Sequence, residues 1–378
     1  MVHTAFRVCV VGSLNMDTVQ FRSIQRLGHS QSTRSDRKFP GGIGANHAVA
    51  VYRMSHPRPQ TATSQGLDAK LPFEVSVSMI GKIGPDTNGE TVKQALVDHQ
   101  INVQGVTTAK GQITGTASIQ LYEDGQSAVQ NVQNANSELQ PSDVEYFWPT
   151  PNTDLVVVSL EIPPKTASRA VALAREKKVP VILNLTPEPD PILLDDNELF
   201  RVDHLIMNYR DADNILELPL IDDYNRRKSS TVQKRYSDAA SRFHGKGASC
   251  VVITLGEMGA LVSFVIPENE DGAGSKRTWS FGAQRPIETQ ENAQRDETGA
   301  SDAFVGAYAV EILRRLHNKI AISQSQAILN ALEIGTKAGG YSVGVVGGMD
   351  GCPWRDQIVG GCAFAAVESS QGRRGGAR

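Results

Sequence analysis

The chain has 378 residues, 40% of them hydrophobic, which is enough for one large α/β domain or two modest ones. Its 38 basic and 41 acidic residues give a formal charge of −3, so we expect no general attraction to nucleic acid or to membranes. No apolar run approaches the roughly 18–20 residues that span a bilayer, and the first residues lack the design of a signal peptide. The four cysteines and eight histidines show no metal-ligand spacing, so we expect free thiols in a cytoplasmic protein, with a nuclear location left open.

Short apolar runs alternate with helical patterns along most of the chain. The expected strands are continuous apolar runs, as in strands covered on both faces: Val8–Val11, Val75–Ile80, Leu155–Leu160, Val179–Leu183, His204–Met207 and Cys250–Thr254. The expected helices are Ala45–Met54, Asn88–His99, Lys165–Lys178, Tyr209–Leu216, Val232–Lys246 and Ala303–Leu316. This alternation predicts a mainly parallel sheet wrapped by helices.

Two regions, 14–40 and 112–133, interrupt this alternation. They are polar and favour strands, which predicts a small separate sheet that could act as a lid. The stretches 55–71, 219–230 and 267–278 are rich in polar or turn residues and are interpreted as insertions. The tail 363–378 ends in a Gly/Arg-rich segment and is predicted to be disordered.

Asp302 follows the small residues Gly299, Ala300 and Ser301, which open the apolar helical run. The N-terminus of a helix presents unpaired backbone N–H groups and is therefore suited to binding an anion. A carboxylate beside such a site repels the anion, so its presence suggests that it is needed as a base. A base next to an anion site is what phosphoryl transfer to a hydroxyl requires. The alternative is an ordinary helix-start Asp, which helices favour on their own account.

Polar side chains also follow two of the expected strands. Asn15 and Asp17 come after the first strand, and Glu161 comes after the third. Ligands of open α/β sheets bind outside the carboxyl ends of the strands, and carboxylates and amides can hold the hydroxyls of a polyol. Asx turns are the alternative interpretation. The segment Gly41–Asn46 adds paired glycines, which allow a ligand close to the backbone or simply form a turn.

Two further strand ends carry possible phosphate-binding groups. Asn208 and Asp211 stand three residues apart, and could meet a hydrated Mg²⁺ and phosphate oxygens or could cap a helix. The glycines of Thr254–Gly259 could let a nucleotide lie against the turn, or could form a tight hairpin.

In their order and spacing, these motifs resemble the ribokinase branch of the PfkB carbohydrate kinase family over residues 6–362. Gly41-Gly-Ile-Gly-Ala-Asn-His-Ala-Val-Ala50 is similar to the first family signature, usually Gly-Gly-Lys-Gly-Ala-Asn-Gln-Ala. Asp296-Glu-Thr-Gly-Ala-Ser-Asp302 is similar to the second, usually Asp-Thr-Thr-Gly-Ala-Gly-Asp. The opening strand with Asn15 and Asp17, the turn Thr254–Gly259 and Pro353-Trp-Arg355 also match.

The resemblance implies one ribokinase-like domain over 1–362, a Rossmann-like three-layer fold whose β lid often forms a dimer contact. Asp302 would be the base, and the anion hole would be formed by Gly299, Ala300 and Ser301. The residues implied to hold the sugar are Asn15, Asp17, Gly42, Gly44, Asn46, Glu161 and Asp302. Those implied to hold ATP are Asn208, Thr254, Leu255, Gly256, Glu257, Met258, Gly259, Ser301 and Lys337. Asp211 would organise Mg²⁺ indirectly, and a monovalent cation, typically K⁺, would bind near Asp296, Thr298 and Gly347.

The implied activity is ATP-dependent phosphorylation of a sugar, with D-ribose as the expected substrate and D-ribose 5-phosphate and ADP as the products. A kinase for another pentose or for a nucleoside such as adenosine, and a ligand-binding pseudokinase, remain alternatives. The chain departs from the family pattern at Ile43, Glu297 and Ser301, and in the stretches 27–32 and 131–136. Ile43 removes a cationic donor near the sugar, and Glu297 adds negative charge where a phosphate should pass.

Overall fold

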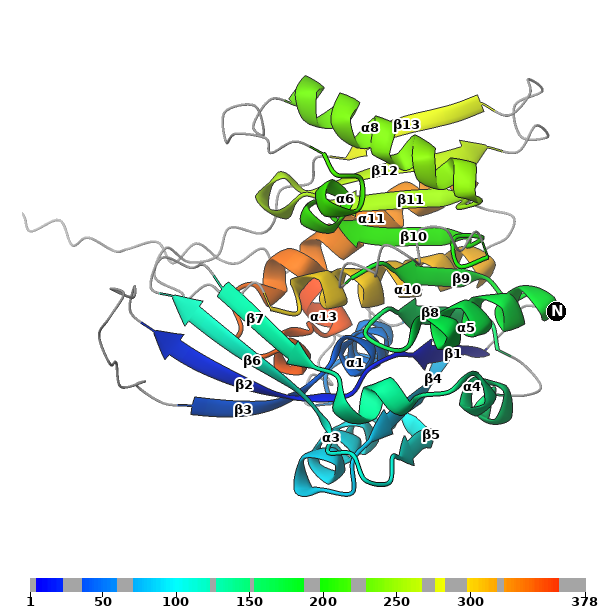
Figure 1. Ribbon diagram of the computed structural model, residues 1–378. Helices are drawn as coiled ribbons and strands as arrows, with labels where there is room; N and C mark the ends of the chain where they lie inside the picture. Colours follow the sequence, from blue (N-terminus) through cyan, green and yellow to red (C-terminus); the bar gives the residue numbers. More distant parts are fainter. Residues whose placement is uncertain are drawn as a thin grey trace, which may run out of the picture.

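The computed structural model describes residues 5–22, 36–59, 71–122, 127–149, 153–186, 198–218, 229–266, 276–282, 298–317 and 323–359. Nine strands form one twisted sheet in the order β13-β12-β11-β10-β9-β8-β1-β4-β5 (Figure 1). Their bounds are β1 Ala5–Val11, β4 Glu74–Ile83, β5 Asn102–Thr108, β8 Leu155–Ser159, β9 Val181–Asn184, β10 His204–Asn208, β11 Cys250–Thr254, β12 Ala260–Ile266 and β13 Lys276–Gly282. The strands from β5 to β11 pair in parallel, and β12 and β13 add an antiparallel edge.

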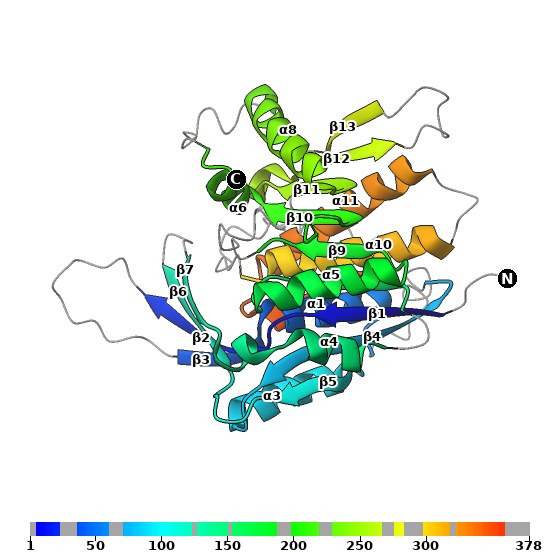
Figure 2. The same ribbon diagram turned by 45° about the vertical axis from the view of Figure 1, so that its right-hand side comes forward.

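Helices cover both faces of this sheet, so that the molecule has three layers (Figures 1 and 2). One face carries α1 Ile43–Ser55, α3 Thr87–Asp98, α10 Ala300–His317 and α11 Gln324–Ser342. The other carries α4 Pro141–Phe147, α5 Pro164–Glu176, α6 Tyr209–Ile215 and α8 Ser229–Lys246. The strands supply both cores by alternation: in β8, Leu155 and Val157 pack in the first core, and Val156 and Val158 in the second.

A second sheet of four strands, in the order β3-β2-β6-β7, projects from one side of the large sheet (Figures 1 and 2). Its strands are β2 Asn15–Arg22, β3 Asp36–Gly41, β6 Gly115–Tyr122 and β7 Ser127–Val132. They come from the two polar regions in which the sequence predicts a lid, so that part of the prediction is confirmed. Val129 and Val132 on the edge strand β7 are 50% and 54% exposed. A homodimer through this sheet stays a prediction.

All six predicted strands and all six predicted helices are present, with ends that differ by a few residues. The sequence did not predict β5, β12 or α4, and the start of β13 fell in a predicted insertion. The C-terminal helix that the resemblance implies near Lys337 is present as α11. The segment β5 reads Asn-Val-Gln-Gly-Val-Thr-Thr and lies at the sheet edge, where a strand needs fewer apolar residues. The rest of the predicted insertions and the whole of the tail 363–378 lie outside the described residues, apart from a few positions at their ends.

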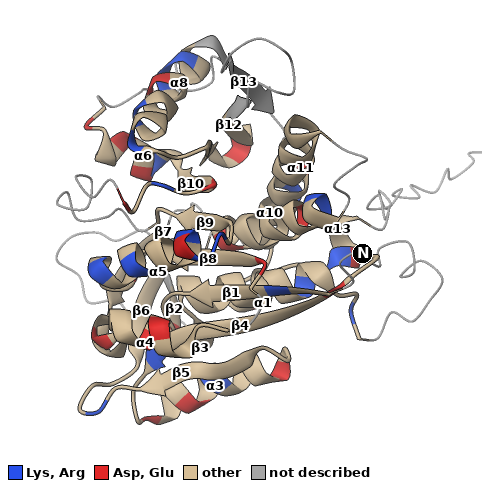
Figure 3. Cartoon of the chain, turned by 90° about the vertical axis from the view of Figure 1, so that its right-hand side faces the viewer, with Lys and Arg blue, Asp and Glu red and all other residues tan. Residues whose placement is uncertain are grey.

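Charged residues lie on the helices and loops around the sheet, and the central strands are almost free of them (Figure 3). The sequences of β8, β9 and β11 contain no charged residue at all. No helix in the described part of the chain has the length and apolar character needed to cross a bilayer.

The last described segment returns to the helical layer of α1 and α10. It contains two short helices, α12 Gly348–Gly351 and α13 Arg355–Ile358. Arg53 on α1 donates hydrogen bonds to the carbonyls of Met349 (2.9 Å) and Cys352 (2.8 Å). These hydrogen bonds tie the last turn of α1 to the α12 segment. Gly348, the first residue of α12, lies against the Asn46 side chain and against Gly299, beside the candidate site.

Candidate active site

The central strand β1 is where the order of the sheet reverses. The chain runs from β1 to β4 and β5 on one side, and later to β8, β9, β10 and β11 on the other. Such a switch point leaves an opening at the carboxyl ends of the two strands on either side of it, here β1 and β8. Ser13 follows β1, Glu161 follows β8, and the Ser13 hydroxyl donates a hydrogen bond to Glu161 Oε2. Asn15 Nδ2 donates to the same oxygen at 3.0 Å, so two predicted sugar-binding residues meet here.

Asn136 fixes the loop between β1 and β2 from the lid side. It lies in the short 3₁₀ helix Asn134–Glu138 after β7. Its side chain accepts from the Leu14 backbone N–H (2.9 Å) and donates to Asn15 Oδ1 (2.7 Å). The root of the lid is therefore hydrogen-bonded to the loop that carries the candidate sugar-binding residues.

The glycines of the first motif allow α1 to begin against this loop. Gly42 has φ +92° and precedes the first residue of α1. A Cβ at Gly42 would stand 2.6 Å from the Asn15 backbone nitrogen, so no larger residue fits without a shift. Nearby, Gly44 N lies 3.5 Å from Ser13 Oγ, and the Asp17 carboxylate on β2 lies against Gly41 on β3.

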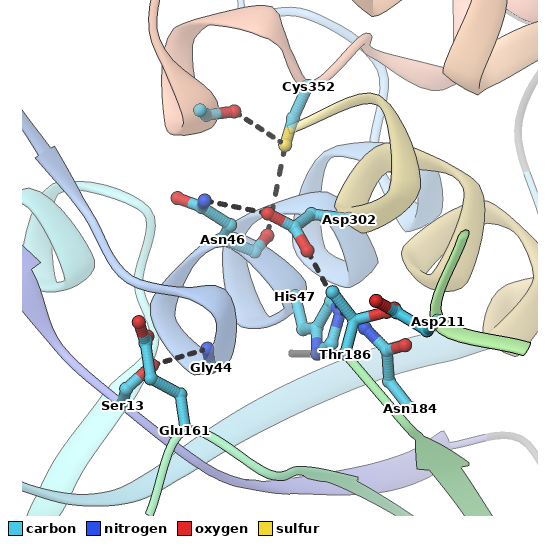
Figure 4. Close-up of polar contacts among 11 residues, drawn as sticks. Ser13, Gly44, Asn46, His47, Glu161, Asn184, Thr186, Asp211, Asp302 and Cys352 are labelled. Atoms are coloured by element: carbon cyan, nitrogen blue, oxygen red, sulfur yellow. Dashed lines mark hydrogen bonds and ion pairs between the residues drawn. The ribbon is translucent and has the colours of Figure 1, made fainter. Parts of the chain in front are cut away.

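Asp302 is the third residue of α10 and is buried, with 6% of its surface exposed. Asn46 Nδ2 donates to its Oδ2 at 2.8 Å, and His47 Nε2 lies 3.2 Å from its Oδ1 (Figure 4). The two helices can approach closely because Gly306 on α10 packs against the backbone of Ala50 on α1. This crossing brings the predicted base to the predicted sugar-binding Asn46.

The predicted anion hole lies at the beginning of α10. Gly299 has φ +81° and precedes the helix, and Ala300 and Ser301 are its first two residues. The Ser301 hydroxyl is buried and has no hydrogen-bond partner in the described part of the chain. A Cβ on Gly299 would stand 2.8 Å from Gly348 Cα, so the segments before α10 and α12 are in close contact. Asp296 and Glu297 lie outside the described residues.

Asn208 and Asp211 lie at the carboxyl end of β10 and the start of α6. The Asp211 N–H donates to Asn208 Oδ1 at 2.9 Å, which makes Asn208 the cap of this helix. Asp211 Oδ2 accepts hydrogen bonds from Asn208 Nδ2 and from Thr186 Oγ1, both at 2.6 Å. The cap interpretation is thus correct, and it leaves a role toward phosphate untested.

The other predicted nucleotide-binding residues lie farther along the same sheet edge. Thr254 is the register partner of Asn208, and the turn up to Gly259 joins β11 to β12 as a tight hairpin. Lys337 is on α11, where its Nζ pairs with Glu333 Oε1 at 2.7 Å. The structure brings Asn15, Glu161, Asn46 and Asp302 into one connected region. It places the turn Thr254–Gly259 and Lys337 on neighbouring elements.

Comparison with known proteins decides the family. The family model described as "pfkB family carbohydrate kinase" matches residues 5–355. The chain belongs to the PfkB carbohydrate kinase family. It is therefore a phosphotransferase that acts on a hydroxyl group, and family membership supports ATP as the phosphoryl donor.

Individual PfkB relatives match over nearly the whole chain. Ribokinase of Haemophilus influenzae is 26% identical over 352 residues, covering 93% of this chain and 96% of that protein. The structure of ribokinase from Giardia lamblia has a TM-score of 0.72 at 20% identity, covering 93% of this chain and 98% of that one. Arabidopsis thaliana ribokinase complexed with ribose and ATP has a TM-score of 0.68 at 23% identity, covering 94% and 97%. A deoxyribokinase of Salmonella typhi (23% identity) and a Methanocaldococcus jannaschii nucleoside kinase structure (TM-score 0.64) also match.

Several residues of this candidate site were not singled out from the sequence. Ser13, Asn136, His47, Asn184 and Thr186 all take part in its hydrogen bonds. His47 offered a signal, because it stands in the first signature at a position usually occupied by Gln. Asn184 and Thr186 offered none beyond their position at the end of an apolar strand.

Burial is the strongest influence on the pKa of Glu161. It raises the pKa of the Glu161 carboxyl, and the nearby Asp302 carboxylate raises it further. Hydrogen bonds from Ser13, the Ile43 N–H and Asn15 act in the opposite direction, because they stabilise the charged form. The net effect is a carboxyl that keeps its proton to higher pH in the folded chain than in the unfolded chain.

Glu161→Gln should therefore change how stability depends on pH. The unfolded chain releases the Glu161 proton near pH 4.5, whereas the folded chain releases it only at higher pH. The parent protein then loses stability as the pH rises from about 4.5 through the folded-state pKa, and the variant lacks this loss. Urea unfolding between pH 4 and 8 should show the stability difference shifting in favour of the variant with rising pH. Parallel pH profiles would contradict the assignment, and Glu333→Gln on α11 is the partly exposed control.

Proposed function

We propose that this protein transfers the γ-phosphoryl group of ATP to the 5-hydroxyl of D-ribose, giving D-ribose 5-phosphate and ADP. The observation that carries the proposal is the Asp302 carboxylate, buried at the N-terminus of α10 and hydrogen-bonded by Asn46. It is supported by the Ser13–Asn15–Glu161 hydrogen bonds at the switch point of the sheet. The names of the matching ribokinases favour ribose over other sugars.

In this proposal Asp302 accepts the proton of the attacking hydroxyl. Phosphoryl transfer involves little covalent chemistry by the protein, so that positioning and charge stabilisation account for most of the rate. The backbone N–H groups of Gly299, Ala300 and Ser301 at the start of α10 stabilise the charge on the transferring group. Asn15, Asp17, Asn46 and Glu161, with the backbone at Gly42 and Gly44, hold the sugar hydroxyls.

The residues near α6 fit an indirect role toward Mg²⁺. Because Asp211 Oδ2 already accepts from Thr186 and Asn208, that oxygen orients two donors instead of meeting the ion directly. Mg²⁺ keeps several of its own waters when bound in proteins, and this arrangement suits water-mediated contact. When bound, Mg²⁺ neutralises charge on the β- and γ-phosphates of ATP.

Thr298 and Gly347 fit a shared monovalent-cation site. They belong to the two segments that meet where Gly299 lies against Gly348. Gly347 has φ +99°, a conformation in which its backbone can turn toward a ligand. We propose that K⁺ binds between these segments, with Asp296 as a further ligand.

A nucleoside such as adenosine is the second candidate substrate. Ile43, the first residue of α1 and only partly buried, replaces the Lys that is usual in the family signature. An apolar side chain suits a purine base better than a sugar hydroxyl.

An ADP-release assay with ATP and Mg²⁺ tests the proposal. The substrates are D-ribose, 2-deoxy-D-ribose, other pentoses, fructose and adenosine, each with and without K⁺. We expect the highest kcat/KM for D-ribose, stimulation by K⁺, and a product phosphorylated at the 5-position by ³¹P NMR. A higher kcat/KM for adenosine would make the protein a nucleoside kinase. Ribose binding by calorimetry without ADP release would make it a pseudokinase.

A further inference from the structure

His47 is a buried titratable side chain that has no role in the reaction proposed above. It follows Asn46 on α1 and none of its surface is exposed. Its Nε2 lies 3.2 Å from Asp302 Oδ1 and 3.1 Å from Asn184 Nδ2 at the end of β9 (Figure 4). The ring is thus enclosed between the candidate base and the central sheet.

The position of the ring hydrogen follows from what surrounds each nitrogen. Nδ1 has no hydrogen-bond partner in the described part of the chain. A buried N–H without a partner costs more than a buried acceptor without one, so the hydrogen belongs on Nε2. A hydrogen on Nε2 faces Asp302 Oδ1 across the 3.2 Å contact, whereas a lone pair on Nε2 would repel that carboxylate. Asn184 Nδ2 lies 3.1 Å from the same nitrogen, and in this orientation the Asn184 oxygen has no partner among the described residues. Turning the amide brings that oxygen to Nε2, so that the single Nε2 hydrogen is shared between Asn184 and Asp302.

Both oxygens of Asp302 therefore face polar groups of consecutive residues on one helix. Asn46 donates to Oδ2, and His47 Nε2 lies 3.2 Å from Oδ1. Hydrogen bonds to a charged group are shorter and stronger than those between neutral groups, and a buried site strengthens them further. Rotation of the carboxylate plane would take Oδ2 away from Asn46 Nδ2 or Oδ1 away from His47 Nε2. A general base must lie within hydrogen-bond reach of the proton that it removes, so this restraint acts on the geometry of the reaction.

We propose that His47 is a positioning residue that fixes the carboxylate of Asp302 for proton transfer from the substrate hydroxyl. The proposal rests on the proposed role of Asp302 as the base. His47 itself does not touch the substrate. Its effect is exerted through a hydrogen bond from Nε2 to Oδ1 across the 3.2 Å contact, and Asn184 contacts the same nitrogen.

Two substitutions separate positioning from packing. His47→Leu keeps an apolar ring-sized volume but removes the donor, whereas His47→Gln keeps an N–H donor on a side chain of similar length. With D-ribose and ATP, we expect His47→Leu to lower kcat by roughly 10- to 100-fold, with KM for ribose changed by less than about 3-fold. His47→Gln should recover most of the lost kcat, which a purely steric role would not predict.

The hydrogen bond itself can be observed without turnover. In protein labelled with ¹⁵N-histidine, we expect a downfield Nε2–H signal that is absent from His47→Gln and shifts upfield in Asp302→Ala. His204→Gln is the matched packing control, because His204 is also buried and contacts α10 through Tyr308 at 2.9 Å. It should lower the melting temperature and leave kcat close to that of the parent.

The outcomes distinguish this inference from the proposed function. If Asp302→Asn is inactive while His47→Leu is as fast as the parent, the positioning role is wrong and the proposed function stands. If the parent shows no turnover, or Asp302→Asn is fully active, the proposed function is wrong, and with it the positioning role. If His47→Leu fails to fold, the NMR comparison decides: an Nε2–H signal unchanged in Asp302→Ala overturns the inference.

Discussion

Replacing Asp302 by Asn should lower kcat for the sugar by about 10²- to 10⁴-fold, the range attributed to a general base, while the protein stays folded. The amide has nearly the shape of the carboxylate and can still accept a hydrogen bond from Asn46. It cannot take the proton of the hydroxyl. The remaining rate would come from positioning and from the N–H groups at the start of α10.

The measurement is steady-state kinetics with D-ribose and ATP, together with the melting temperature of each variant. Asp238→Asn is the control, because it makes the same chemical change at an exposed position on α8. It should leave both kcat and melting temperature unchanged. An Asp302→Asn enzyme as fast as the parent would remove Asp302 from the role of base.

Replacing Glu311 by Ala should lower the free energy of unfolding by about 3–5 kcal/mol, the cost of breaking a buried ion pair by removing one partner. Glu311 on α10 pairs with Arg355 at 3.0 Å, and both side chains are 3% exposed. Arg355 also donates to the Met54 carbonyl at the end of α1. Without Glu311, the Arg355 charge would remain buried, and burial already lowers its pKa.

Urea unfolding would measure this change, and a double variant sharpens the test. Glu311→Leu combined with Arg355→Met replaces the pair by apolar groups and should be less destabilised than Glu311→Ala. Glu198→Ala is the surface control, because the Arg175–Glu198 pair is largely exposed, and it should change stability by less than about 1 kcal/mol. A loss below about 1 kcal/mol for Glu311→Ala would contradict the role of this pair in anchoring the last segment.

Much of the fold could be predicted from local patterns of apolar residues. The segment Leu155–Ser159 is a continuous apolar run because helices cover both faces of β8. The lid was recognised because its two parts are polar and favour strands. The missed strand β5 lies at the edge, where burial is incomplete and the sequence pattern is weaker.

The candidate site could be predicted only where it lies on contiguous motifs. Asp302, with Gly299, Ala300 and Ser301, was found because small residues and a carboxylate open an apolar helix. Asn184 and Thr186 could not be found, because nothing in their segment differs from the end of any buried strand. His47 stood in a recognised motif, but the motif does not show that its ring reaches Asp302.

The sequence by itself determined the family, most elements of the fold and the candidate for the base, because these depend on residues close together in the chain. The tertiary structure alone decided which side chains surround that base. Asn46 and Asp302 are 256 positions apart, and His47 and Asn184 are 137 apart. Their contacts depend on the strand order and on the close crossing of α1 and α10 at Ala50 and Gly306. The local pattern of apolar residues indicates which positions are buried, but it gives no information about the distance between segments that are remote in the sequence. The contact of His47 with Asp302 is therefore seen only in the folded chain.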